Sequence, residues 1–154
     1  MSSNLSNFLK DQEGCKLDAY SSLEKGDTKT IGYGHVMQPG DPDKITNEQA
    51  NSMLDADIKK HSDYARNAVG GDVFDNLSQN QKDMLSEYSY SLGPSFNTKF
   101  PKMTQGILDN DKDVMMKEYK RNFTNKEGNK VELKRRNDAF RDTFINQVPD
   151  KANE

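Results

Sequence analysis

Hydrophobic positions at the start of the chain follow the period of an α-helix. Apolar residues recur at positions i, i+3 and i+4 and form one stripe, which predicts a helix over residues 4–13. Gly14 comes next and suits the left-handed conformation in which many helices end. Glu13 therefore occupies the last turn, where the carbonyl end of the helix dipole disfavours a negative charge.

Residues 16–36 have a different pattern, in which apolar and polar positions alternate. Residues 24–27 have the composition of a turn, and residues 30–35 return as a strand that contains two glycines. Glycine in a strand often marks a close approach of the backbone to a ligand or to a neighbouring element. The pattern predicts a β-hairpin or a small sheet.

Helical spacing resumes after residue 45. Two capping boxes, at residues 46–49 and 78–81, predict the starts of two helices. The first of these helices is long and is expected to end at Gly70, and the second is expected to end at Gly93.

The last third of the chain is also mostly helical. Shorter helices are expected near residues 97–109 and 111–121, and residues 123–130 have the composition of a polar loop. A final helix follows, and Pro149 stops it. Arg136 lies one helical turn before Phe140 in this helix.

These elements predict an α+β fold of one domain spanning residues 1–154. A small N-terminal antiparallel β lobe, about residues 14–45, is joined by a long helix to a helical lobe. The helical lobe takes in about residues 46–148 together with the first helix, residues 4–13. A cleft between two lobes is a common place for a binding site.

Composition narrows the class of protein. The length of 154 residues suits one domain, and no apolar run approaches the roughly 20 residues of a membrane span. A net charge of -3 argues against general nucleic-acid binding. The single Cys15 excludes an internal disulfide and is expected to be a small buried side chain, and with two histidines it is too little for a zinc site. We therefore expect no metal or cofactor.

Glu13 and the residues that follow it are the candidates for chemistry. A carboxylic acid kept protonated at a helix end is what a general acid needs to protonate a leaving oxygen. Glu24 or Asp27 in the turn would supply a second carboxylate, and Thr30 would hydrogen-bond a water between them. Inverting glycosidases use two carboxylates that lie roughly 6.5–9.5 Å apart. Spacing alone leaves open whether Glu13 is instead an ordinary exposed residue at a helix end.

Three blocks of the sequence resemble the signature of the phage-type lysozymes or endolysins (glycoside hydrolase family 24, lysozyme-like superfamily). They are Glu13-Gly14, Ala19-Tyr20 and the run T-I-G-Y-G-H over residues 30–35. The resemblance continues with L-S-Q-N-Q-K-D-M-L over residues 77–85 and with K-R-R over residues 134–136, so it spans nearly the whole chain.

The resemblance implies a lysozyme-like fold and cleavage of the β-1,4 bond between N-acetylmuramic acid and N-acetylglucosamine in peptidoglycan. Glu13 matches the general acid of the family, and Thr30 matches the threonine that positions the attacking water. His35 matches a structural histidine, expected here to tie the β lobe to the first helix. Tyr33 and Tyr90 are expected to line the saccharide cleft, although Tyr90 is equally well explained as a core residue. The resemblance and the spacing also make Arg136 a structural arginine.

The match breaks at the second carboxylate. Family members usually carry Asp two residues after the tyrosine, where this chain has Ser22. Counting back from Thr30 instead selects Glu24, and Asp27 is a third candidate. With Ser22 as the true equivalent, the protein would be a slow hydrolase, a lytic transglycosylase or a wall-binding protein without activity. In a transglycosylase the muramic 6-hydroxyl attacks in place of water.

The family resemblance also implies partners and a location. The partner is bacterial peptidoglycan, with no nucleic acid and no membrane span, and a monomer is the default. The first residues lack a basic region followed by an apolar stretch, so no signal peptide is expected. The protein would then stay in the host cytoplasm until a holin releases it to the wall and the host lyses, or it would be carried on a phage particle.

Overall fold

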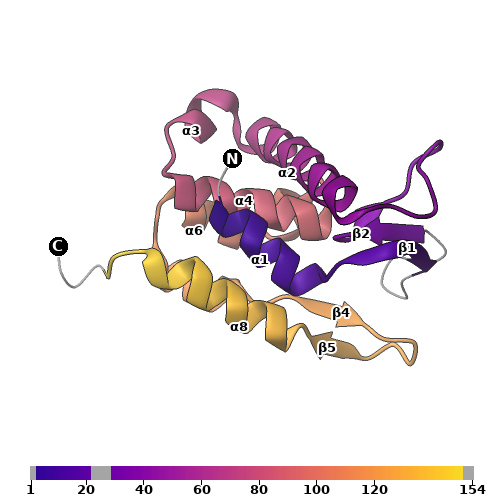
Figure 1. Ribbon diagram of the computed structural model, residues 1–154. Coiled ribbons are helices and arrows are strands. Elements are labelled where there is room, and N and C mark those ends of the chain that lie inside the picture. Colours follow the sequence, from indigo (N-terminus) through magenta and orange to yellow (C-terminus); the bar gives the residue numbers. More distant parts are fainter. Residues whose placement is uncertain (1–2, 22–28, 151–154) are drawn as a thin grey trace. The chain divides into compact units, whose positions relative to one another are not determined.

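A computed structural model describes residues 3–21 and 29–150 (Figure 1). The architecture is α+β, as the sequence predicts: a mainly helical chain with a small antiparallel sheet. The described chain forms two compact units, residues 3–60 and the part from residue 61 to residue 150, and the long helix α2 (Asn47–Val69) runs through the boundary. None of the helices in the described part of the chain is long and apolar enough to cross a membrane.

The first unit begins with the predicted helix. Helix α1 (Ser3–Glu13) buries its apolar stripe, formed by Leu5, Phe8 and Leu9. It ends at Gly14, which adopts a left-handed φ of 66° and donates its N–H to the carbonyl of Lys10 at 3.1 Å. The glycine therefore ends the helix as predicted, because a residue without a side chain enters this conformation without a steric penalty.

A three-stranded antiparallel sheet follows, in the order β1 (Lys16–Ser21), β2 (Lys29–Gly32), β3 (His35–Val36). The prediction of one strand over residues 30–35 is wrong. Gly32 and Gly34 have φ values of 65° and 77°, and the chain turns between β2 and β3. Left-handed residues break the extended backbone, so the two glycines that the pattern placed inside a strand make a turn instead.

The register of β1 against β2 is irregular. Lys16 pairs with Gly32, and Tyr20 pairs with Thr30. Between these two pairs, β1 therefore contains two residues more than β2. The other side of β1 is held by the loop before α2, where the amide of Ile45 donates to the carbonyl of Leu17 at 2.9 Å. The small core here consists of Ile31, Ile45 and Ala50, with Ala19, Tyr33, Met37 and Met53 packed at its edge.

Helix α2 starts at the first predicted capping box. The amide of Thr46 donates to Oε1 of Gln49 at 2.9 Å, and the amide of Gln49 donates to Oγ1 of Thr46 at 3.2 Å. Ile45 and Ala50 flank this box and are both buried. The reciprocal bonds satisfy donors that a helix start leaves without partners, which is why the start could be predicted.

The second unit holds the remaining elements. They are α3 (Gly71–Asp75), α4 (Gln79–Leu92), α5 (Phe96–Lys99), α6 (Pro101–Leu108), α7 (Lys112–Glu118), β4 (Asn122–Thr124), β5 (Lys130–Glu132), α8 (Lys134–Thr143) and a 3-10 helix (Ile145–Gln147). Helix α4 begins at the second capping box, as predicted. The helix expected over residues 97–109 is two helices, because Pro101 cannot continue α5 but suits the first turn of α6.

The polar loop expected over residues 123–130 is wrong. The chain forms the β4–β5 hairpin, in which Phe123 pairs with Val131 (Figure 1). Its turn is closed by the side chain of Asn125, whose Oδ1 accepts the amides of Glu127 at 3.1 Å and Asn129 at 2.9 Å. Two strands of three residues are too short to produce a visible alternation in such a polar sequence.

A buried ion cluster stabilises the interior of the second unit. Glu87, without exposed surface, accepts two hydrogen bonds from Arg121 at 2.6 and 2.9 Å and two from Arg136 at 2.8 and 3.2 Å. Burial alone would raise the pKa of Glu87, but the two guanidinium groups outweigh it and lower the pKa. The structural role expected for Arg136 is confirmed, whereas Arg121 was not anticipated.

Candidate functional site

Glu13 is the last residue of α1 and is half-buried. The left-handed Gly14 ends the helix directly behind it, so the carboxylate side chain leaves the helix where the chain turns toward β1. The structure thus places Glu13 where the sequence predicts.

The turn between β2 and β3 meets this carboxylate. A methyl group at Gly34 would lie 2.8 Å from Oε2 of Glu13 and 3.0 Å from its Cδ. Real Cβ atoms do not approach other atoms this closely, so any side chain at Gly34 would push the carboxylate away. The φ of 77° favours glycine at position 34, and the missing side chain lets Glu13 approach the turn, as the glycine pattern indicated for a neighbouring element.

Thr30 lies in the central strand of the same sheet. It pairs with Tyr20 across the β1–β2 ladder, and its Oγ1 donates to the Tyr20 carbonyl at 3.4 Å. Its side chain has no exposed surface. The described geometry therefore gives Thr30 a hydrogen bond within the sheet.

The three candidates for the second catalytic group lie outside the described residues. They are Ser22, Glu24 and Asp27. Ser21 pairs with Lys29 at the point where the described chain leaves and re-enters the sheet.

Tyr33 lies at the turn, between Gly32 and Gly34. Its ring packs against the small core, and Nζ of Lys10 lies 5.9 Å from the ring centroid. Burial and the neighbouring Cys15 both raise the pKa of the Tyr33 hydroxyl.

Cys15 itself is exposed, so the expectation of a buried thiol is wrong. It lies one residue beyond the glycine that ends α1, in the link before the chain enters the sheet.

His35 follows Gly34 and is held by two carboxylates. Its Nδ1 lies 2.7 Å from Oδ2 of Asp57 on α2, and its Nε2 lies 2.9 Å from Oδ2 of Asp41 in the loop that follows β3. Burial by itself lowers the pKa of His35, but the bonds and charges of Asp57 and Asp41 outweigh it and raise the pKa. The expected tie to the first helix is wrong, because both ring nitrogens are occupied by these carboxylates. No motif or spacing in the sequence marks Asp41 or Asp57 as a partner of His35, because these residues come together only in the folded chain.

Two hydrogen bonds hold the carboxylate of Asp41 in place. The amide of Gln38 donates to its Oδ2 at 2.7 Å, and this bond, followed by the one to His35, lowers the pKa of Asp41. The ring of His35 thereby joins the β2–β3 turn to α2. The bonds of His35 therefore help to hold the neighbouring Gly34, against which Glu13 packs. They involve Asp41 and Asp57, which no motif in the sequence marks as site residues.

Tyr90, the second expected aromatic residue, belongs to α4 in the other unit. It is half-buried, and its ring centroid lies 5.2 Å from that of His61. His61 in turn has its Nδ1 3.0 Å from Oγ of Ser89.

In the first unit, the structure brings together Glu13, Gly34 and the turn residue Tyr33. The part of the chain that it describes holds no group of three potential metal ligands.

Known proteins share both sequence and fold with this chain. The sequence model of the phage lysozyme family matches residues 10–139. Over 96 residues, the chain is 34% identical to the endolysin of Lactococcus phage c2 and to that of Lactococcus phage phivML3. This stretch is 62% of the chain but 41% of the length of either endolysin, so the chain accounts for less than half of these relatives.

Solved structures resemble the chain over most of its length. An endolysin from Escherichia coli O157:H7 phage FAHEc1 is 28% identical, with a TM-score of 0.68 over 97% of this chain and 96% of that one. A variant of P22 lysozyme is 27% identical, with a TM-score of 0.67 over 94% and 97%. The muramidase domain of SpmX from Asticaccaulis excentricus, at 22% identity and a TM-score of 0.67 over 93% and 95%, shares the fold alone. The fold is lysozyme-like, and the chain belongs to the phage lysozyme family.

Proposed function

We propose that this protein is a peptidoglycan hydrolase that cleaves the β-1,4 bond between N-acetylmuramic acid and N-acetylglucosamine and lyses bacteria. The observation that carries the proposal is the packing of Glu13 against Gly34 at the end of α1, in a chain that belongs to the phage lysozyme family. The endolysin names of the similar phage proteins support the same reaction class.

In the proposed reaction Glu13 is the general acid. Its carboxyl proton passes to the glycosidic oxygen as the bond to the anomeric carbon breaks, and positive charge develops on the sugar ring. A water molecule attacks the anomeric carbon, and its proton goes to the carboxylate of Glu24 or Asp27. Thr30 hydrogen-bonds this water. The products are two shorter glycans, one with a reducing N-acetylmuramic end.

The turn at Gly34 explains how Glu13 can serve this role. The missing side chain at Gly34 leaves room for the carboxyl group of Glu13 beside the turn, where we propose that it meets the glycosidic oxygen. The bonds from His35 to Asp41 and Asp57 hold the residue that follows Gly34 in this turn. Tyr33 lies in the same turn, and we propose that its exposed edge contacts a sugar ring; for Tyr90 the same role is proposed from the family resemblance.

A second candidate reaction is favoured by the burial of Thr30. Its hydroxyl already bonds the Tyr20 carbonyl and has no exposed surface, so holding a water would require this hydroxyl to become accessible. A lytic transglycosylase needs no positioned water. There the muramic 6-hydroxyl attacks the anomeric carbon, Glu13 gives its proton to the leaving oxygen and takes one from the 6-hydroxyl, and a 1,6-anhydro end forms. Ser22 at the position of the usual aspartate would then be explained.

Mass spectrometry of the soluble products from purified peptidoglycan separates the reactions. Reducing N-acetylmuramic ends are the expected result and identify the hydrolase. 1,6-Anhydro ends identify the transglycosylase. Intact glycan with folded protein bound to it contradicts both and identifies a wall-binding protein without activity.

We also propose that the protein acts as a monomer and reaches the wall through a holin. Light scattering after gel filtration tests the first point, and a dimer would contradict it. For the second, expression in a bacterial host should cause lysis only when a holin is co-expressed. Lysis without a holin would contradict the proposed route.

A further inference from the structure

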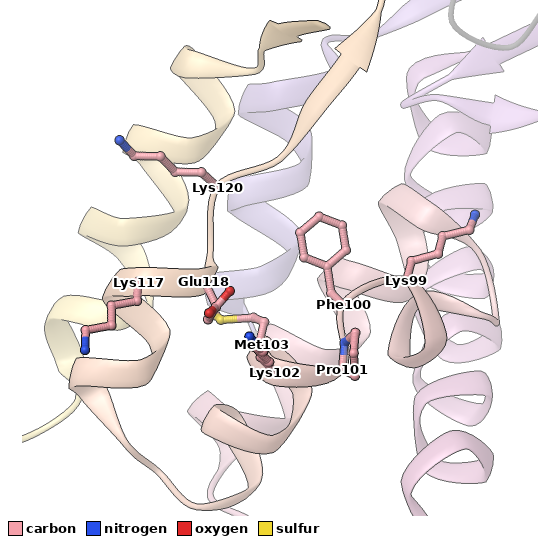
Figure 2. A pocket seen from close by; sticks show the side chains of 8 residues that line it. All are labelled: Lys99, Phe100, Pro101, Lys102, Met103, Lys117, Glu118 and Lys120. Carbon is pink, nitrogen blue, oxygen red and sulfur yellow. The ribbon is translucent and has the colours of Figure 1, made fainter.

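A recess in the second unit gathers charged side chains without bringing them together. It has a volume of about 360 Å³ and lies between the start of α6 and the end of α7. Figure 2 shows the ammonium groups of Lys99, Lys117 and Lys120 pointing away from one another. Nζ of Lys120 lies 3.9 Å from Oε1 of Glu132 instead. Cations that point apart do not share one ligand, so this recess is not a binding site for an anion.

Around His35 in the first unit, two carboxylates from different elements converge on one ring. Nδ1 is 2.7 Å from Oδ2 of Asp57 on α2, and Nε2 is 2.9 Å from Oδ2 of Asp41 in the loop after β3. A carboxylate accepts hydrogen bonds and donates none, so each contact is a hydrogen bond when the facing ring nitrogen carries a proton. Both contacts together therefore require the doubly protonated, charged ring.

The charged groups that act on this ring, among the residues that the structure describes, are the same two carboxylates. Burial lowers the pKa of His35, but the bonds and charges of Asp57 and Asp41 outweigh it and raise the pKa above 6.5. The pKa of Asp41 is lowered, first by the amide of Gln38 and then by His35. The charged ring and the ionised Asp41 therefore coexist up to the raised pKa of His35, and the ring loses a proton above it.

The loop that follows β3 is anchored at both ends. At its start, the amide of Met37 donates to the carbonyl of Lys29 at 3.0 Å. At its end, the amide of Ala19 donates to the carbonyl of Asp43 at 2.9 Å. Residues 38–42 lie between these two backbone bonds and are called the clamped loop below.

Two side-chain bonds tie the clamped loop to β3. Asp41 bonds the ring of His35, and Nε2 of Gln38 donates to the carbonyl of Val36 at 3.2 Å. The second bond does not change with pH, because neither an amide nor a carbonyl titrates in this range. Above neutral pH, the attachment of the loop therefore depends on the protons of His35.

The two carboxylates differ in what else bonds them. The side chain of Asp57 is 14% exposed, and its carboxylate has no second hydrogen bond within residues 3–21 and 29–150. The side chain of Asp41 is 25% exposed, and its Oδ2 also accepts the amide of Gln38 at 2.7 Å. A more buried carboxylate without any partner costs more free energy than a wetter one that keeps a partner. The single N–H of the neutral ring therefore belongs on Nδ1, facing Asp57.

We infer that the clamped loop is a pH-dependent latch, held against β3 while His35 carries two protons and released at Asp41 when Nε2 loses its proton. Nε2 and Oδ2 of Asp41 would then be two acceptors at hydrogen-bonding distance, which repel each other. The loop moves between its anchored ends, while Nδ1 keeps its bond to Asp57. The latch acts beside the turn that Glu13 approaches, because His35 directly follows Gly34. Release of the loop requires no glycan, so the latch does not depend on the proposed cleavage.

NMR spectroscopy of the full chain tests the latch in a titration from pH 5.5 upward. We expect the Nε2 signal of His35 to reach the shift of an unprotonated nitrogen, while Nδ1 stays protonated. In step with it, the backbone order parameters of Gly40 and Asp41, from carbon relaxation, should fall from about 0.85 to below about 0.6. A loop that keeps its order while His35 titrates would overturn the inference, and so would loss of the proton from Nδ1.

Asp41→Ala removes the latch contact and leaves both anchored ends. Its loop should have order parameters below about 0.6 at every pH, without a step. The matched control is Asp43→Ala, which removes an exposed carboxylate that has no partner in the described part of the chain. The control should keep the order and the step of the parent. Parental order in Asp41→Ala at pH 5.5 would overturn the role of Asp41.

The two histidines of the chain provide a second pair of variants. His35→Gln has no titrating ring, so the pH-dependent step in loop order should disappear. His61→Gln is the control, because His61 bonds Ser89 in the second unit, and it should keep the step. A step that persists in His35→Gln would overturn the inference, since another group would then drive the release. Circular dichroism checks the fold of each variant.

Discussion

The carboxylate of Glu13 packs against the backbone of Gly34, although 21 residues separate them in the chain. The contact joins the end of α1 to the turn between β2 and β3. Because a side chain at Gly34 would overlap Oε2 of Glu13, the glycine and the glutamate form one structural feature.

Gly34→Ala should remove activity by displacing Glu13. The new Cβ would lie 2.8 Å from Oε2, and a displacement of the acid by about 1 Å lowers a rate by roughly 100-fold. The φ of 77° adds a cost of about 1–2 kcal/mol in the free energy of unfolding. Glycan release and urea unfolding measure the two effects.

The control for this substitution is Gly128→Ala. Gly128 has a φ of 84°, and a methyl group there would meet nothing within 4 Å. It should lose a similar amount of stability, about 1–2 kcal/mol, and keep full activity. Full activity of Gly34→Ala would show that Glu13 does not depend on this contact.

Glu13→Gln should abolish wall lysis and leave the fold intact. The amide has nearly the same shape but no acidic proton, so the loss is that of a general acid, roughly 100- to 10,000-fold. Glu48→Gln, an exposed glutamate in the first turn of α2, is the matched control and should stay active. Turbidity of a wall suspension measures lysis, and circular dichroism checks the fold. Lysis by Glu13→Gln at the parental rate would refute the assignment.

Either Glu24→Gln or Asp27→Asn should be severely impaired, but not both. One carboxylate is needed to accept the proton of the attacking water, and a second one nearby is not. Initial rates of glycan release from the two single variants give the answer. If both variants stay active, the transglycosylase reaction becomes the better explanation.

The bonds of His35 should make stability depend on pH. The pKa of His35 is raised above its ordinary value of 6.5, so its contribution is complete below that pH and is lost as pH rises through the raised value. The pKa of Asp41 is lowered from 3.8, so its contribution is present above that pH and is lost as pH falls through the lowered value. Both contributions are therefore complete between the two ordinary values.

The variant His35→Gln measures this contribution. The difference in the free energy of unfolding between parent and variant should be about 1–3 kcal/mol at pH 5.5. It should shrink as the pH rises above 6.5 and through the raised pKa of the histidine. A difference that stays constant or grows with pH would contradict the assigned charge on His35.

Glu87→Gln should be among the most destabilising single substitutions. It leaves Arg121 buried without its carboxylate partner, and breaking a buried ion pair in this way costs about 3–5 kcal/mol. Asp75→Asn, which breaks the exposed pair with Arg66, is the control and should have little effect. Urea unfolding compares the two. Similar midpoints for both variants would contradict the structural role of the buried cluster.

Local signals in the sequence predicted the helix boundaries well. The capping boxes at Thr46 and Ser78 form both reciprocal bonds, and Gly14 ends α1 in the left-handed conformation. These features act between residues three or four positions apart, so their partners are already visible in the sequence.

The errors share a different cause. The sequence predicts Gly32 and Gly34 inside a strand, because alternation does not reveal a left-handed φ. The β4–β5 hairpin was missed because its strands are short and exposed. The partners of His35 were missed because Asp41 and Asp57 lie 6 and 22 residues away, where spacing carries no information.

By itself, the sequence determined the α+β fold, the family and the position of Glu13 at a helix end. Periodicity, capping and a family motif are local properties, and a chain keeps them in whatever context it folds. Tertiary structure alone decided that Gly34 packs against Glu13, that His35 bonds two carboxylates, and that Arg121 and Arg136 meet Glu87 in the interior. These depend on contacts between distant residues, whose distances and burial exist only once the elements are packed.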